Sequence, residues 1–409
     1  MPSDDPIGRK VPPPREGGVG NGGRTGGGLA PSAESPSSHR LQPPKRFYAL
    51  DAFRGVAALS IVFWHWQHFF FKNGAPGPGI WPWHRFFLLF YGYGQLAVEL
   101  FFALSGFIFF WLYARPIADG AVAPRDFFLR RVSRLVPLHL VTLFLVILGQ
   151  IAYRHHFGSD FVYPHNDLRH FVPNLLLVNA WGLGYSHSFN GPVWSVSVEI
   201  ALYVLFFLLC RTVPIRAVVL TAVSLLGLLL LAQWDMPIGR GMIAFFLGGC
   251  VHRAYAWSLK TGAAEKLAKI LPWITGALWI GTLVAVYTPT FHLDAWPWIK
   301  QHPLATTLGP SILLFPITIL TLALAETVRG TFWKRTSYLG DLSYSVYLLH
   351  FPLQLTFALV AGWLSIDHAF FSSPAALLLF FVVLLPLAWV SYRFLEIPAQ
   401  RWLRGRVGG

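Results

Sequence analysis

Arg54 and His65 are two ionisable residues in the first long apolar segment of the chain, eleven positions apart. Eleven residues make about three helical turns, so both side chains share one face, about 16 Å apart along the axis. An ionisable residue in such a segment is costly and is therefore a functional candidate. Arg54 can bind a phosphate or carbonyl oxygen, and His65 can accept a hydroxyl proton or itself carry an acyl group. Alternatively, Arg54 extends to the polar end of its segment and His65 only bonds a neighbouring helix.

Three arginines at the start of the third apolar segment form a second candidate group. Arg131 and Arg134 are three positions apart, and Arg130 and Arg134 are four apart. Residues at these spacings share a surface on a helix. We expect them to bind the phosphates of a nucleotide-like donor, because guanidinium groups match phosphate geometry. Alternatively, they are topology charges or contacts with anionic lipid.

Glu199 lies about two turns into the fourth apolar segment, which begins at Pro192. A carboxylate at that depth needs a partner from another helix. Glu199 can position an acceptor hydroxyl or hold His65 in one tautomer, and the alternative is a purely structural ion pair. Trp194 and Ser197 precede it and are candidates for the acceptor side of a site.

The ninth apolar segment carries Tyr344 and Tyr347, which are three positions apart and so share a helix face. That face continues with the apolar Phe351, so we expect its polar part to be short. Tyr344 and His350 are candidate supporting residues, although His350 can equally be a helix-packing residue. Ser105 is not in a Gly-x-Ser-x-Gly turn, so we interpret Ser105 and Gly106 as a notch for helix contact.

The composition shows which elements must position these residues. The chain has 409 residues, 55% hydrophobic and only 12% charged, against about 25% charged in soluble proteins. We therefore predict an all-α polytopic membrane protein, because lipid cannot satisfy the backbone groups of irregular segments. The fourth and sixth of ten predicted segments contain polar residues and should be the least hydrophobic. The ten segments span about 48–71, 86–113, 135–153, 192–210, 217–234, 238–257, 270–288, 304–325, 341–363 and 374–392.

The charge distribution predicts the orientation of these segments. The net charge is +14, but Lys and Arg lie in short clusters between apolar segments, unlike the single basic patch of a nucleic-acid-binding protein. With the N-terminus inside, cytoplasmic segments after the tail hold twenty Lys and Arg and the opposite side holds six. This bias predicts a multi-pass protein of the cell (inner) membrane with both termini in the cytoplasm.

The remaining segments suggest a simple domain organisation. Residues 1–45 are rich in Gly, Pro and Ser and are predicted to be a disordered cytoplasmic tail. Residues 46–403 form the predicted membrane domain, and 404–409 a short cytoplasmic C-terminus. An outside loop, about 154–191, carries five histidines that we expect to be solvated, and no metal site is predicted. Its apolar part, 171–178, is too short to span and should lie at the interface or dip back into the membrane.

Taken together, six motifs resemble the acyltransferase 3 family of membrane acyltransferases, over about residues 46–403. Two departures concern the first and fourth motifs: Ala52 and Phe53 stand where the family usually has Gly and Leu, and Ile200 where it usually has a second Glu. The last departure bears on acceptor recognition. The motifs are Leu50–Gly55 with the Arg54 and His65 spacing, Phe101–Phe107, Arg130–Arg134, Trp194–Glu199, Ser343–Pro352 and Ser391–Pro398.

This resemblance implies an integral membrane O-acyltransferase. Its expected donor is cytoplasmic acyl-CoA, most simply acetyl-CoA, as a co-substrate with no bound cofactor. The expected acceptor is a hydroxyl of a surface or secreted carbohydrate or a lipid-linked glycan. The resemblance also implies that Arg54 and His65 are the catalytic pair, supported by Arg131, Arg134 and Glu199. A second hypothesis is a non-catalytic transporter or flippase of a glycan or lipid, although no inverted repeat is evident.

Overall fold

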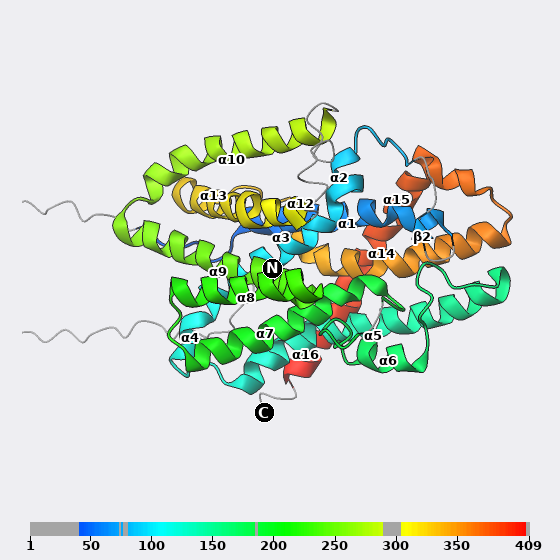
Figure 1. Cartoon of the computed structure of the whole chain (residues 1–409), viewed down its shortest axis with the longest axis horizontal. Helices are drawn as coiled ribbons and strands as arrows, with labels where there is room; N and C mark the ends of the chain where they lie inside the picture. The colour runs from blue at the N-terminus through cyan, green and yellow to red at the C-terminus, as the bar shows by residue number, and fades with distance from the viewer. Residues whose placement is uncertain (1–40, 73–74, 77–80, 185–186, 289–303, 406–409) are drawn as a thin grey trace, which may run out of the picture. The chain divides into compact units, whose positions relative to one another are not determined.

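The computed structural model describes residues 41–72, 75–76, 81–184, 187–288 and 304–405 (Figure 1). Most of the predicted tail, 1–40, and the last residues, 406–409, lie outside this part of the chain. The α-helices are α1 (Tyr48–His65), α2 (Leu88–Tyr93), α3 (Ala97–Leu112), α4 (Ala114–Ala118), α5 (Pro124–Phe157), α6 (Leu168–Leu175), α7 (Trp194–Thr212), α8 (Ala217–Trp234), α9 (Pro237–Thr261), α10 (Ala264–Tyr287), α12 (Leu304–Gly309), α13 (Phe315–Arg329), α14 (Tyr338–Trp363), α15 (Pro374–Ser391) and α16 (Ile397–Gly405).

Short elements join or extend these helices. The only strands in the described residues, β1 (Phe71–Lys72) and β2 (Ala75–Pro76), pair antiparallel just after α1. The remaining short elements are 3-10 or π helices: η1 (Trp66–Phe70), η2 (Gly94–Leu96), η3 (Gly191–Val193), η6 (Pro310–Leu314), η7 (His368–Ser372) and η8 (Tyr392–Glu396). The prediction of an all-α fold is confirmed.

The ten predicted segments correspond to ten long helices or runs of helices. α1 and α9 are long enough to cross a membrane but are more polar than the other long helices. The prediction of low hydropathy for the sixth segment, α9, is therefore confirmed. The prediction was wrong for the fourth segment, α7, because its Leu- and Phe-rich second half outweighs Glu199. Eight helical runs in the described residues are both long and apolar enough to span: Leu88–Leu112, Pro124–Phe157, Gly191–Thr212, Ala217–Trp234, Ala264–Tyr287, Pro310–Arg329, Tyr338–Trp363 and Pro374–Gly405.

Two glycines allow α1 and α14 to pack closely. A Cβ atom on Gly55 would lie 2.5 Å from Cβ of Leu339, and one on Gly340 would lie 2.1 Å from the carbonyl oxygen of Asp51. Neither site has room for a larger residue, so the two backbones approach as small residues permit. The helices run in the same direction, since Arg54 contacts Gly340 and His65 contacts His350.

A second close contact joins α3 to α9. A Cβ atom on Gly106 would lie 1.9 Å from the carbonyl oxygen of Phe245, and one on Gly248 would lie 2.1 Å from that of Ala103. The predicted contact notch at Gly106 is confirmed. Ser105 has a further role, because its hydroxyl donates to Glu199 of α7 at 3.4 Å.

The loop between α5 and α7 packs back onto the helices. The loop contains α6, and Nε2 of His139 on α5 donates to the carbonyl oxygen of Asn174 in that helix at 2.9 Å. The expectation of solvated histidines was wrong for His170, which is buried and bonds Asp167 at 2.7 Å. Hydrogen bonds from the side chain and backbone of His170 lower the pKa of Asp167. Asp167 also caps α6, which explains why this short helix forms here.

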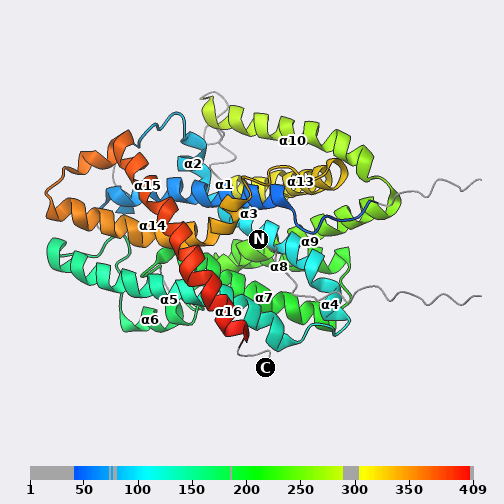
Figure 2. The ribbon, with the colours of Figure 1, turned by 180° about the vertical axis from the view of Figure 1, so that it is seen from behind.

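α5 has 34 residues and is therefore about 50 Å long, against a hydrocarbon core of about 30 Å. Its first turns, with Arg130, Arg131 and Arg134, pack in the bundle beside α16, and Figure 2 shows α5 and α16 from behind. We call this end of the bundle, marked by Arg54, Arg131 and Arg134, the basic end. The opposite end, marked by His65 and His350, we call the histidine end.

Candidate active site

One stripe of α14 connects the basic end to the histidine end. Gly340, Tyr344, Tyr347 and His350 follow at spacings of four, three and three residues, so they lie on one helix face over about 15 Å. The Tyr344 hydroxyl donates to the carbonyl oxygen of Leu135 on α5 at 2.5 Å. The expectation that the polar face stops at Tyr347 was wrong, because His350 continues it.

His65 is the last residue of α1, and its ring contacts His350. Nδ1 of His350 lies 2.6 Å from the carbonyl oxygen of Tyr347, so this nitrogen carries a proton. Nε2 of a neutral His350 therefore accepts, and Nδ1 of His65 donates to it at 3.0 Å. The proton of His65 is then on Nδ1, and its Nε2 has a free lone pair. Nε2 makes no side-chain hydrogen bond among the described residues, and a backbone hydrogen bond links the ring of His65 to Ile61.

A second hydrogen-bonded chain fixes the backbone beneath His65. The Gln354 amide donates to the carbonyl oxygen of His65 at 2.9 Å and accepts from Nδ1 of His68 at 2.9 Å. The Tyr163 hydroxyl donates to Nε2 of His68 at 3.3 Å. When the imidazoles of His65 and His68 are both neutral, each donor in this series of hydrogen bonds faces an acceptor. The C-terminus of α1 is therefore held by α14 and by the loop after α5.

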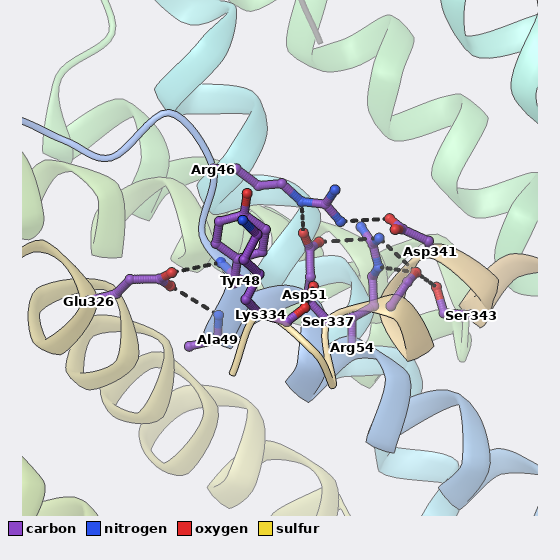
Figure 3. Close-up of polar contacts among 11 residues, drawn as sticks. Arg46, Tyr48, Ala49, Asp51, Arg54, Glu326, Lys334, Ser337, Asp341 and Ser343 are labelled. Carbon is purple, nitrogen blue, oxygen red and sulfur yellow. Dashed lines mark hydrogen bonds and ion pairs between the residues drawn. The ribbon is translucent and has the colours of Figure 1, made fainter. Parts of the chain in front are cut away.

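Arg54 contacts the first turn of α14 (Figure 3). Its Nε and Nη2 donate to the carbonyl oxygen of Gly340 at 3.2 and 2.8 Å, and Nη2 lies 3.2 Å from Oδ1 of Asp51. These contacts differ from the expected donor contact, because two of the three nitrogens hold α1 against α14. Nη1 has no hydrogen-bond partner in the described part of the chain, so it remains available to a substrate.

An ion-pair network surrounds Arg54 at the start of α1 (Figure 3). Arg46 donates to Asp51 and to Asp341 of α14, at 2.6 Å each. Burial acts to lower the pKa of Arg46, but the two carboxylates outweigh it and raise the pKa. The carboxylate of Glu326 on α13 accepts the first free N–H groups of α1, from Tyr48 and Ala49, at 3.0 Å each. The start of α1 is thus fixed to α13 and α14.

Arg131 lies in an aromatic cage at the basic end. Its guanidinium carbon is 4.4 Å from the ring centre of Phe109, 4.6 Å from Tyr113 and 5.2 Å from Phe127. Its Nε and Nη2 are buried and have no hydrogen-bond partner among the described residues. Buried charged donors are normally satisfied. These two nitrogens are therefore suited to an anionic ligand.

Three further arginines surround Arg131. Arg404 of α16 donates to the Ser133 hydroxyl at 3.3 Å and lies within electrostatic reach of Arg130, Arg131 and Arg134. Arg404 lies 270 positions after Arg134 in the sequence, so no local spacing connects it to α5. Like charges this close repel one another, so the group favours a bound anion.

Glu199 lies beside the arginines rather than beside His65. Its carboxylate accepts hydrogen bonds from the hydroxyls of Tyr203 and Ser105, and its charge acts on Arg134. The partner that fixes the tautomer of His65 is therefore His350. The expected partners from other helices are therefore Ser105 of α3, through a hydrogen bond, and Arg134 of α5, through its charge.

The first turn of α7 meets the stripe of α14 near His350. The Tyr347 hydroxyl donates to the carbonyl oxygen of Pro192 at 2.6 Å and lies 2.7 Å from the Ser195 hydroxyl. The Ser197 hydroxyl is buried and accepts from the backbone N–H of Ala180 at 3.1 Å. Ser197 thus anchors the loop before α7, which differs from its expected place on the acceptor side.

Trp194 lies beside a charged pair that sequence reasoning missed. The guanidinium of Arg240 on α9 stacks 5.0 Å from the Trp194 ring centre and binds Glu99 of α3 at 2.5 Å. Both charged residues lie in apolar segments, so the rule that selected Arg54 and His65 would also have selected them.

Comparison with known proteins places this chain in a family. The family model of the acyltransferase 3 group, described as an acyltransferase domain, matches residues 47–393. "Acyltransferase MdmB" of Streptomyces mycarofaciens is 32% identical over 183 residues, covering 42% of this chain and 43% of that protein. "Putative peptidoglycan O-acetyltransferase YrhL" of Bacillus subtilis is 22% identical over 393 residues, covering 88% of this chain and 56% of that protein.

A third relative, "Protein 2 in picA locus" of Rhizobium radiobacter, is 38% identical over 104 residues, covering 25% of this chain and 46% of that protein. The chain thus spans about half the length of these curated relatives. No solved structure matches it. Because the family model covers nearly all the described helices, the chain belongs to the acyltransferase 3 family and is a multi-pass membrane protein.

Proposed function

We propose that this enzyme transfers an acyl group, most simply acetyl, from cytoplasmic acyl-CoA to a hydroxyl of a surface or secreted carbohydrate. The observation that carries the proposal is the hydrogen-bonded chain from Tyr347 through His350 to His65, which leaves Nε2 of His65 as a free base. The name "Acyltransferase MdmB" agrees with acyl transfer, and the name "Putative peptidoglycan O-acetyltransferase YrhL" agrees with transfer to oxygen.

The basic end is the proposed entrance for the donor. Coenzyme A carries phosphates at one end and the acyl thioester at the other, so its binding site must be cationic at one end only. Arg130, Arg131, Arg134 and Arg404 meet that requirement, and Arg131 offers two unpartnered nitrogens. The acyl group then extends along the face of α14 toward His65. The Lys and Arg distribution supports a basic end in the cytoplasm of the cell (inner) membrane.

Two chemical routes are open to Nε2 of His65. In direct transfer, it takes the proton of the acceptor hydroxyl while the hydroxyl oxygen attacks the thioester carbonyl. The carbon–sulfur bond breaks, an ester forms, and the proton passes to the CoA thiolate. In the covalent route, Nε2 itself attacks the carbonyl, releases CoA and then passes the acyl group to the hydroxyl. Release of CoA without an acceptor distinguishes the covalent route.

Labelled acetyl-CoA tests the proposal. Purified enzyme in lipid nanodiscs should transfer label to cell-envelope glycans, and His65→Ala should lower the rate at least about 100-fold, because it removes the base. The matched control is His155→Ala, since His155 is exposed at the end of α5. A correctly inserted His65→Ala enzyme with normal activity would exclude the proposed role of His65. Absence of label in every glycan fraction would exclude acetyl transfer to carbohydrate.

A further inference from the structure

The ion pair of Arg240 and Glu99 is built asymmetrically at the histidine end. Both Nε and Nη2 of Arg240 lie 2.5 Å from the same oxygen of Glu99, Oε1. The other oxygen, Oε2, is buried and receives no hydrogen bond from another described residue, although the backbone N–H of Glu99 itself acts on the carboxylate, and only 2% of Glu99 is exposed. A buried carboxylate oxygen is normally satisfied. This pair therefore has one acceptor atom left for another molecule.

The pair also reaches the surface of the bundle. The Arg240 side chain is 26% exposed, and Nη1 has no hydrogen-bond partner in the described residues. One face of its guanidinium is against Trp194, whose ring is half-buried and lies 6.5 Å from that of the exposed His187. The site thus combines the free Nη1 donors of the partly exposed Arg240, a buried carboxylate oxygen that no other described residue bonds, and an aromatic ring.

The pair lies close to the histidine chain. Tyr347, whose carbonyl fixes His350, is within electrostatic reach of both Arg240 and Glu99. Its hydroxyl also contacts Ser195, the residue after Trp194. A molecule bound at Arg240 therefore lies near Tyr347, the residue whose carbonyl orients His350 and through it His65.

From this geometry we infer that Glu99, Arg240 and Trp194 form the acceptor subsite, and that the acceptor is an uncharged sugar bound through neighbouring hydroxyls. Adjacent hydroxyls offer one donor and one acceptor, which match Oε2 of Glu99 and the free N–H groups of Arg240. The pair carries no net charge, so it does not favour an anionic ligand over a neutral one. Trp194 supplies an apolar surface for a sugar ring. This inference rests on the proposed function of the enzyme.

Transfer kinetics with separated glycans test the inference. Cell-envelope glycans are divided by anion exchange into neutral and acidic pools, and each pool is offered to the full chain in nanodiscs with labelled acetyl-CoA. The neutral pool should accept the label. Glu99→Gln and Arg240→Lys should each raise KM for the neutral pool about tenfold or more, because a hydrogen-bonding site loses its matched partner. KM for acetyl-CoA should not change, which also shows that each variant is folded.

The control variant is Arg154→Lys, since Arg154 forms an exposed ion pair with Asp160 elsewhere on the chain. It should leave both KM values unchanged. Label in the acidic pool alone, or an unchanged KM for the neutral pool in Arg240→Lys, would overturn the inference while leaving acyl transfer established. If neither pool accepts label, the proposed function itself fails.

Discussion

At the scale of single residues, the chemistry of His65 depends on a neighbour that holds one of its two nitrogens. The backbone carbonyl of Tyr347 cannot donate, so it fixes the proton of His350 on Nδ1, and His350 fixes that of His65. The lone pair of His65 therefore has one position. This is the arrangement that a general base requires, with one nitrogen oriented and the other free.

His350 is expected to be a positioning residue. His350→Leu removes the acceptor for His65 and should lower kcat about 100-fold or more, with KM for acetyl-CoA unchanged. His350→Gln should restore much of the rate, because its amide oxygen can accept at the position of Nε2. The measurement is steady-state transfer with both substrates varied. Equal rates for the Leu and Gln variants would show that His350 only fills space.

The arginines of the basic end differ in their surroundings. Arg131 is enclosed by aromatic rings, and Arg134 lies near the charges of Glu199 and Glu396. Arg54 donates through two of its three nitrogens to the carbonyl oxygen of Gly340. The residues named as one donor-binding group by their spacing thus have different surroundings, and Arg131 has the clearest unused donors.

At the scale of elements, α14 determines which side chains meet. It contacts α1 near both of its ends, through Gly340 at the basic end and His350 at the histidine end. Between these contacts it bonds α5 through Tyr344 and α7 through Tyr347. A shift of α1 along α14 would therefore move Arg54 and His65 together. The glycines that permit close packing also set this register.

The α1 and α14 contact is expected to be intolerant of added volume. In Gly340→Ala the new methyl group would lie 2.1 Å from the carbonyl oxygen of Asp51, so we expect a loss of about 1–3 kcal/mol of stability. Acyl transfer should fall as well, because the His65 and His350 register changes. The readouts are thermal unfolding of the purified protein and the labelled transfer assay.

Gly276→Ala is the matched control for that substitution. Gly276 lies inside α10 with no atom within 4 Å of the added Cβ. Alanine should be neutral or stabilise by about 0.5–1 kcal/mol through its helix propensity. If Gly340→Ala behaves like Gly276→Ala, the two helices are not held at the separation described.

At the scale of the whole molecule, the bundle has two chemically different ends. Arginines from α5 and α16 gather at one end, and His65, His68, Glu99 and Arg240 lie toward the other. An enzyme that takes a charged donor from one side of a membrane and a glycan from the other requires this separation.

The proposed orientation predicts which surfaces face the cytoplasm. After the two native cysteines are replaced by serine, Lys266→Cys at the start of α10 should resist an impermeant thiol reagent in intact cells. Arg169→Cys in α6 should react, because the two exposed residues lie on opposite sides in the predicted topology. Both variants should react after the membrane is permeabilised. Reaction of the Lys266→Cys variant alone in intact cells would invert the orientation.

The sequence alone determined the number and type of the elements and which of them carry chemistry. Ionisable residues are expensive in apolar helices, so Arg54, His65 and Glu199 are conspicuous without a structure. Helical spacing also placed Tyr344 with Tyr347, because periodicity is a local property. Resemblance to a known family supplied the type of reaction.

Only the tertiary structure decided which partner each of these residues has. Hydrogen bonds such as that from His65 to His350 join residues 285 positions apart, and no local pattern encodes such a pairing. The same holds for Arg404 beside α5 and for Arg240 with Glu99. Helix packing sets these distances through the shapes of many side chains at once, so a single sequence shows the candidates but not their contacts.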